Sequence, residues 1–129
     1  MRLPELPGLL SADEVAATAR SIARSQEPDG AIPWSPLDKV DLWNHVEAAM
    51  GLLAGGEVDA AEAAYYWALR TQRPDGSWPM RLHLGSVDDP GTETNMCAYL
   101  AVGVWHHWLL RHDLARVEEL WPAVRRGLD

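Results

Sequence analysis

A five-residue motif that occurs twice places the strongest constraint on the fold. It reads Gln26-Glu27-Pro28-Asp29-Gly30 in the first copy and Gln72-Arg73-Pro74-Asp75-Gly76 in the second. Each proline lacks the N–H that a continuing helix would use and disfavours helical backbone in the residue before it, while each glycine permits a positive φ. The motif therefore predicts a helix end followed by a tight turn, and its recurrence predicts a tandem repeat.

A segment with helical periodicity precedes each copy of the motif. Ser11 and Glu14 form a capping-box pattern, and the apolar residues that follow share one face up to about Ser25. The second segment runs from about Asp59 to Thr71, again with its apolar residues at helical spacing. We therefore expect two outer helices, each ended by the turn motif.

A second kind of helix is expected after each turn. One spans Asp41 to about Leu53 before Gly55-Gly56, and the other spans Thr92 to about Arg111, with Asn44 aligned on Asn95. These segments are apolar nearly all round, which is typical of inner helices covered by neighbours in the protein rather than of a membrane span. A third outer helix begins at Leu114, and Pro122 predicts a kink or break near Trp121.

The predicted fold is all-α: tandem antiparallel helical hairpins that form part of an (α/α)6 toroid, with about five helices. We treat residues 1–129 as a single toroid fragment. Hairpin 1 covers about 11–56, hairpin 2 covers about 59–112, and an incomplete third repeat covers 113–129.

Composition limits the classes of partner. Nineteen acidic and eleven basic residues give a formal charge of −8, and the arginines are scattered, so a nucleic-acid partner is not expected. The N-terminal apolar stretch is interrupted by Pro4 and Pro7, which does not fit a signal peptide, and we expect a cytoplasmic protein.

The single cysteine, Cys97, excludes an internal disulfide and a thiolate metal cluster.

The Gln-x-x-Asp-Gly-x-Trp turns between outer and inner helices resemble the repeats of terpenoid cyclase and protein prenyltransferase toroids. The match is good from Gln72 to Trp78 and looser from Gln26 to Trp34. The wider pattern is similar to the N-terminal part of actinobacterial prenyltransferase-like proteins. The resemblance assigns these residues to the structural turn motif: Gln26, Asp29, Gly30, Trp34, Gln72, Asp75, Gly76 and Trp78.

The resemblance implies a prenyltransferase-like or cyclase-like toroid that binds an isoprenoid or another apolar substrate in a pocket lined by Trp43, Met50, Tyr99 and Trp105. The chain departs from the catalytic motifs of these families. Ser86-Val87-Asp88-Asp89 lacks the first aspartate of Asp-x-Asp-Asp, and Asn95-Met96-Cys97 has asparagine in place of the zinc ligand of Asp-x-Cys. We therefore expect a fragment that is not catalytically complete alone.

The N-termini of the inner helices are the expected position of a ligand cleft. Glu47 and Glu93 are the candidate catalytic residues, because each falls within the first turns of an inner helix and carboxylates perform general acid and base catalysis. Acidic residues at these positions also stabilise the helix dipole without any catalytic role. The other candidate cleft residues are Asp41, Trp43, His45, Asp88, Asp89 and Asn95.

No metal or cofactor is predicted. His106 and His107 are adjacent and therefore diverge on a helix, and His112 has no carboxylate at a ligand spacing. Cys97 is expected to be a small buried residue. His45 is expected to be a packing or hydrogen-bonding residue, since Glu47 lies on another side of the helix.

Two further functions remain open. A six-hairpin glycosidase-like domain would bind a carbohydrate with paired carboxylates about 5 to 10 Å apart in a cleft rich in tryptophan. A non-catalytic helical-repeat interaction module would self-associate, or bind a partner chain that completes the toroid by covering the helix from Leu114 to Leu128.

Overall fold

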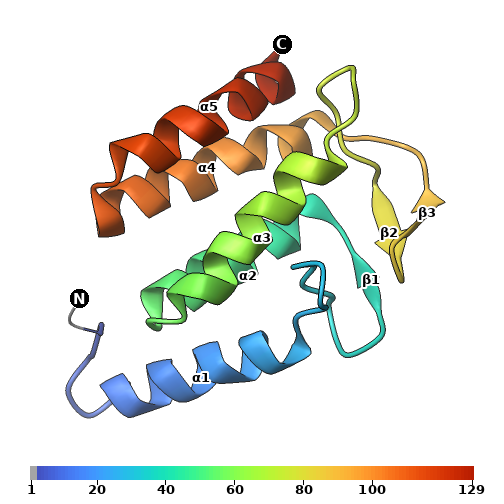
Figure 1. Ribbon diagram of the computed structural model, residues 1–129. Helices are drawn as coiled ribbons and strands as arrows, with labels where there is room; N and C mark the ends of the chain where they lie inside the picture. Colours follow the sequence, from blue (N-terminus) through green and yellow to red (C-terminus); the bar gives the residue numbers. More distant parts are fainter. Residues whose placement is uncertain (1–2) are drawn as a thin grey trace.

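The computed structural model describes residues 3–129 as an array of helices with one small sheet (Figure 1). The helices are α1 (Ala12–Ser25), α2 (Leu42–Ala54), α3 (Val58–Thr71), α4 (Thr94–Arg111) and α5 (Leu114–Leu128). The strands are β1 (Lys39–Val40), β2 (Arg81–His83) and β3 (Ser86–Asp89). The prediction of an all-α fold with about five helices is confirmed, and α2 with α3 and α4 with α5 form antiparallel pairs.

Helix α1 begins and ends where its sequence predicts. The Ser11 Oγ accepts a hydrogen bond of 3.2 Å from the backbone N–H of Glu14, and the Glu14 carboxylate accepts one of 2.8 Å from the backbone N–H of Ser11. This reciprocal pair is the predicted capping box, and it satisfies N–H groups that have no partner inside the helix. These hydrogen bonds lower the pKa of Glu14.

The two glutamines of the turn motif make the same pair of hydrogen bonds. The amide of Gln26 donates to the carbonyl of Gly30, at 3.0 Å, and to that of Ala60 in α3, at 2.9 Å. The amide of Gln72 donates to the carbonyls of Gly76 and Ala123, each at 2.9 Å. Each glutamine thus closes its own turn and attaches it to the next outer helix.

The glycines of the turns permit a close approach between segments. Gly30 and Gly76 have φ values of 95° and 87°, and a Cβ atom at Gly76 would lie 1.9 Å from the carbonyl oxygen of Arg126 in α5. A side chain would therefore force the turn and the outer helix apart.

Helices α2 and α4 are the inner helices, and they repeat one another in burial. With Asn44 aligned on Asn95, buried His45, Val46 and Ala49 of α2 correspond to buried Met96, Cys97 and Leu100 of α4. Gly103 allows α4 to approach α2 closely, since a Cβ there would lie 2.6 Å from Val46 Cγ1. The core lies mainly along these two helices and α3.

An ion-paired cluster joins α3 to α4 and α5. Glu62 contacts the Nε2 of buried His107 at 2.8 Å and the Nε of Arg116 at 2.7 Å. Burial raises the pKa of Glu62, but the hydrogen bond from His107 and the charge of Arg116 outweigh it, so the pKa is lowered overall. The carboxylate therefore stays ionised between its two partners.

The structure corrects three details of the predicted elements. Helix α5 continues through Pro122, so the expected break does not occur. Helix α4 begins at Thr94 rather than Thr92. An antiparallel sheet in the order β1-β2-β3 was not predicted; it brings the segment after the second turn beside the segment before α2.

The tryptophan that follows each turn motif does not play the same part in both copies. Trp78 is fully buried, and its indole N–H donates to the carbonyl of Ala68 at 2.8 Å. The residue at the same position of the first copy is Ile32, which is also buried. The pairing of Trp34 with Trp78 is therefore wrong: Trp34 corresponds to Met80, and 55% of its surface is exposed.

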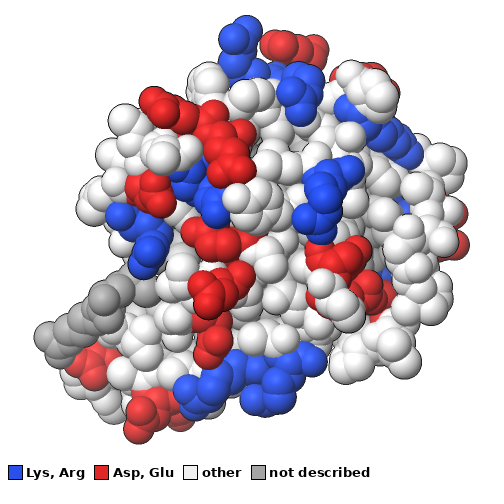
Figure 2. All heavy atoms as spheres, in the orientation of Figure 1, with Lys and Arg blue, Asp and Glu red and all other residues white. Residues whose placement is uncertain are grey.

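Charged side chains of both signs are interspersed over the face of the molecule shown in Figure 2. Within residues 3–129, none of the helices combines the length and apolar character needed to cross a membrane.

Candidate functional site

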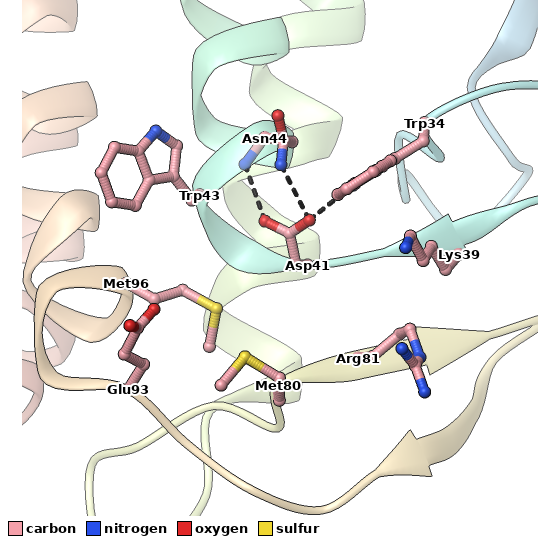
Figure 3. Close-up of a pocket in the computed structure, with 9 residues that line it drawn as sticks. All are labelled: Trp34, Lys39, Asp41, Trp43, Asn44, Met80, Arg81, Glu93 and Met96. Atoms are coloured by element: carbon pink, nitrogen blue, oxygen red, sulfur yellow. Dashed lines mark hydrogen bonds between the residues drawn. The ribbon is translucent and has the colours of Figure 1, made fainter.

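A pocket of about 440 Å³ lies where the inner helices begin and the sheet meets them (Figure 3). The turn before β1, the start of α2, the segment around β2 and the start of α4 all contribute to its walls. The lining residues are Trp34, Lys39, Asp41, Trp43, Asn44, Met80, Arg81, Glu93 and Met96. Residues from the starts of both inner helices therefore line one pocket, which is the candidate for the expected ligand cleft.

Asp41 is the most buried acidic residue of the pocket, with 9% of its surface exposed. It caps α2: its Oδ1 accepts a hydrogen bond of 2.9 Å from the backbone N–H of Asn44. Its Oδ2 accepts one of 2.5 Å from the indole of Trp34 and one of 2.9 Å from the side-chain amide of Asn44 (Figure 3). Three donors thus hold the carboxylate in one orientation.

Aromatic and thioether side chains provide the apolar part of the pocket. The ring of Trp34 is more than half exposed, and the Lys39 ammonium lies 3.9 Å from its centroid. Met80 and Met96 extend toward one another below Asp41 in Figure 3, from the segment before β2 and from α4. A ligand with both apolar and hydroxyl groups would find complementary partners here.

Glu93 supplies the second carboxylate of the pocket. It occupies the N-cap position of α4, is exposed, and makes no side-chain capping hydrogen bond in the described structure. Asp41 holds the equivalent position on α2. The starts of two different inner helices therefore bring one carboxylate each to the same pocket.

Glu47 lies one turn away from the pocket and holds aromatic rings in place. Its Oε1 accepts hydrogen bonds from the indole of Trp43, at 2.9 Å, and from the hydroxyl of Tyr99, at 2.8 Å. The two rings stack with centroids 4.7 Å apart. This hydrogen bond to Glu47, together with burial, raises the pKa of the Tyr99 hydroxyl. Glu47 thereby fixes the position of Trp43, which does line the pocket.

His45 lies below the cleft and not in it. Its side chain is almost completely buried, its Nδ1 accepts from the backbone N–H of Ile32 at 3.1 Å, and its Nε2 donates to the carbonyl of Ala64 at 2.9 Å. Burial lowers the pKa of His45 to about 4, so the ring is neutral at pH 7. Its placement among the cleft residues was wrong, and it connects the first turn to α3.

The remaining predicted cleft residues do not line this pocket. Asp88 pairs with Arg81 at 2.5 Å, and Asp89 accepts a hydrogen bond from the backbone N–H of Gly91. Asn95 lies at a separate depression beside the end of α5. The predicted apolar pocket is also divided, because Trp43 lines the pocket at the helix starts and Trp105 lines a groove between α4 and α5.

The pocket also contains residues that the sequence did not single out. The equivalence of the two turns was a usable signal for one of them: Met80 occupies the same position after Gly76 as Trp34 does after Gly30, and both line the pocket. The unpredicted lining residues are Lys39, Asn44, Met80, Arg81 and Met96.

Within residues 3–129, the structure brings together no group of three or more His, Cys, Asp or Glu side chains suited to a metal ion. His107 instead contacts Glu62, and burial lowers the pKa of His106. Cys97 is buried, with its Sγ 3.2 Å from Thr92 Oγ1.

Comparison with known proteins favours one of the functions left open by the sequence. No family model matches the chain. A protein from Mycolicibacterium hassiacum, the MMP endo-(1,4)-3-O-methyl-alpha-D-mannosidase, is 45% identical to it over 127 residues. The match covers 98% of this chain and 35% of that enzyme, so the chain spans about a third of its relative. The resemblance to prenyltransferases and terpenoid cyclases was therefore wrong.

Proposed function

We propose that this chain forms part of the carbohydrate site of a glycosidase that cleaves within chains of (1,4)-linked α-mannose bearing 3-O-methyl groups. The observation that supports this most is the 45% identity to an endo-mannosidase along 98% of the chain, which includes every residue of the pocket.

The pocket carboxylates suit this chemistry. Most glycosidases use a pair of carboxyl groups, one that protonates the leaving oxygen and one that acts as a base or a nucleophile. Asp41, held by Trp34 and Asn44, is suited to the second role because a fixed carboxylate can stabilise positive charge on the sugar ring. We assign the proton donor to Glu93, the second carboxylate that lines the pocket.

The pocket lining suits a methylated sugar better than an unmodified one. Met80, Met96 and the exposed face of Trp34 offer apolar contacts for O-methyl groups and for the C–H face of a pyranose ring. Lys39 and Arg81 can donate hydrogen bonds to the remaining hydroxyl and ring oxygens. Both sets of side chains line one cavity, as a partly methylated oligosaccharide requires.

The proposal is tested by isothermal titration calorimetry with the 129-residue chain. The ligands are a 3-O-methylated α-(1,4)-mannose oligosaccharide, its unmethylated counterpart and an α-(1,4)-glucose oligosaccharide of the same length. We expect the methylated mannoside to bind at least about tenfold more tightly than either control, a difference of about 1.4 kcal/mol. Equal affinity for all three, or no binding of the mannosides, would refute the assignment.

A further inference from the structure

An apolar groove of about 250 Å³ runs between α4 and α5, away from the pocket at the helix starts. Its walls include Ala101, Trp105 and Trp108 from α4, and Leu114, Val117 and Trp121 from α5. Trp105, Leu114 and Trp121 have 60%, 58% and 52% of their surfaces exposed. Contiguous exposure of large apolar side chains is costly in water and typically marks a binding surface.

The α4 side of the groove continues a single helical stripe. Thr94, Ala98, Ala101, Trp105 and Trp108 follow one another at spacings of three or four residues, which places them on one face of the helix. Thr94 and Ala98 line the open depression beside the end of α5, and the other three line the groove. The whole length of this face is therefore accessible.

The internal repeat shows what covers the equivalent face of α2. With Asn44 aligned on Asn95, Trp43 and Glu47 of α2 correspond to Thr94 and Ala98 of α4. Trp43 stacks on Tyr99, and Glu47 accepts a hydrogen bond from Tyr99, so α4 covers that face of α2. By the same repeat, the open face of α4 is shaped for another inner helix.

Charge and length indicate where that helix comes from. Two copies of a chain with a formal charge of −8 repel one another, which disfavours a second copy as the occupant. The mannosidase relative has nearly two-thirds of its length outside the match to this chain. That unmatched part of the mannosidase is long enough to contain further repeats of the same helical hairpin.

We propose that the groove between α4 and α5 receives an apolar inner helix of the same repeat, carried by polypeptide outside residues 1–129, in the way that α2 receives α4. The helix would insert between Trp105 and Trp121 and cover the stripe from Thr94 to Trp108. This surface is independent of the sugar pocket, so either proposal can fail without the other.

The test uses the unmatched part of the Mycolicibacterium hassiacum mannosidase as the probe, coexpressed with the affinity-tagged 129-residue chain. Variants Trp105→Glu and Trp121→Glu place a charge in the groove, and Leu9→Glu places one on another exposed leucine as a matched control. Circular dichroism of each purified variant checks that the helices are retained. Sedimentation of the chain alone measures self-association.

We expect the probe to copurify with the wild-type chain and with Leu9→Glu, and its recovery to fall at least about tenfold with either tryptophan variant. Three results would overturn the proposal. They are the absence of copurification with the wild-type chain, copurification that is equal for all variants, and a wild-type homodimer that Trp105→Glu dissociates, which would identify a second copy as the occupant.

Discussion

The indole N–H of Trp34 donates a hydrogen bond of 2.5 Å to the Oδ2 of Asp41, linking the segment after the first turn to the N-cap of α2. The same tryptophan lines the pocket, and more than half of its surface is exposed. One side chain therefore both orients the buried carboxylate and offers an apolar face to a ligand. The proposed carbohydrate site depends on this arrangement.

Removing the charge of Asp41 should weaken sugar binding without unfolding the chain. Asparagine is as good an N-cap as aspartate, but its single oxygen cannot accept all three hydrogen bonds that Asp41 accepts, so Asp41→Asn should lower the free energy of unfolding by about 1–3 kcal/mol. The variant also loses the charge-assisted hydrogen bond that we expect between a sugar hydroxyl and the Asp41 carboxylate. Such a loss costs about 1.5–3 kcal/mol, which corresponds to a tenfold to hundredfold rise in the Kd of the methylated oligosaccharide by calorimetry. Asp59→Asn, in the first turn of α3, is the matched control. Equal effects of the two variants would argue against a role for Asp41.

Two substitutions separate the two contributions of Trp34. Trp34→Phe keeps an aromatic face but removes the N–H that Asp41 accepts, while Trp34→Ala removes both. We expect the methylated oligosaccharide to bind Trp34→Phe several-fold more weakly, and Trp34→Ala more weakly still, as measured by calorimetry. If Trp34→Ala binds as tightly as wild type, the ring takes no part in recognition.

The close approach at Gly76 should make it much less tolerant of substitution than Gly85. Both have a positive φ, 87° and 75°, so alanine at either position costs about 1 kcal/mol in backbone strain. At Gly85 nothing lies within 4 Å of an added Cβ, whereas at Gly76 the carbonyl oxygen of Arg126 lies 1.9 Å away. Urea denaturation should show Gly76→Ala to be less stable than Gly85→Ala by about 1–3 kcal/mol. Similar losses would show that α5 does not pack on the turn.

Stability should fall as the pH is lowered from about 6.5 to about 4. Burial lowers the pKa of His45 to about 4, so in this range the unfolded chain binds a proton that the folded chain excludes. The loss attributable to His45 is about 3 kcal/mol over the full range. Burial lowers the pKa of His106 too, which adds a smaller change of the same sign. His45→Gln should flatten the dependence measured by urea denaturation, and an unchanged slope would contradict this assignment.

Local sequence signals predicted the helices well because the determinants lie next to the features they control. Ser11 and Glu14 cap α1 through adjacent backbone groups, and Gly30 and Gly76 adopt the positive φ expected after their prolines. The sequence pattern did not predict the hairpin between β2 and β3. Its turn contains Leu84 with a φ of 48° beside Gly85, and leucine at such a position obscures the usual turn pattern.

The pocket was only partly predictable, since its walls come together through contacts between distant segments. The pocket lies at the starts of the inner helices, where the sequence predicted a ligand cleft, and Asp41, Trp43 and Glu93 line it. Periodicity alone could not show that His45 points into the core toward Ala64, or that Glu47 is engaged by Trp43 and Tyr99. Met80 and Arg81 reach the pocket through the sheet that the sequence did not reveal.

The most direct test of the carbohydrate site is a titration of the tryptophan indole N–H signals by nuclear magnetic resonance with the 3-O-methylated α-(1,4)-mannose oligosaccharide. Signals are assigned by single Trp→Phe substitutions. If the proposed site binds the sugar, the signals of Trp34 and Trp43 shift, while those of buried Trp78 and of Trp105 in the α4–α5 groove do not. Shifts confined to Trp105 and Trp121, or no shift at saturating ligand, would contradict it.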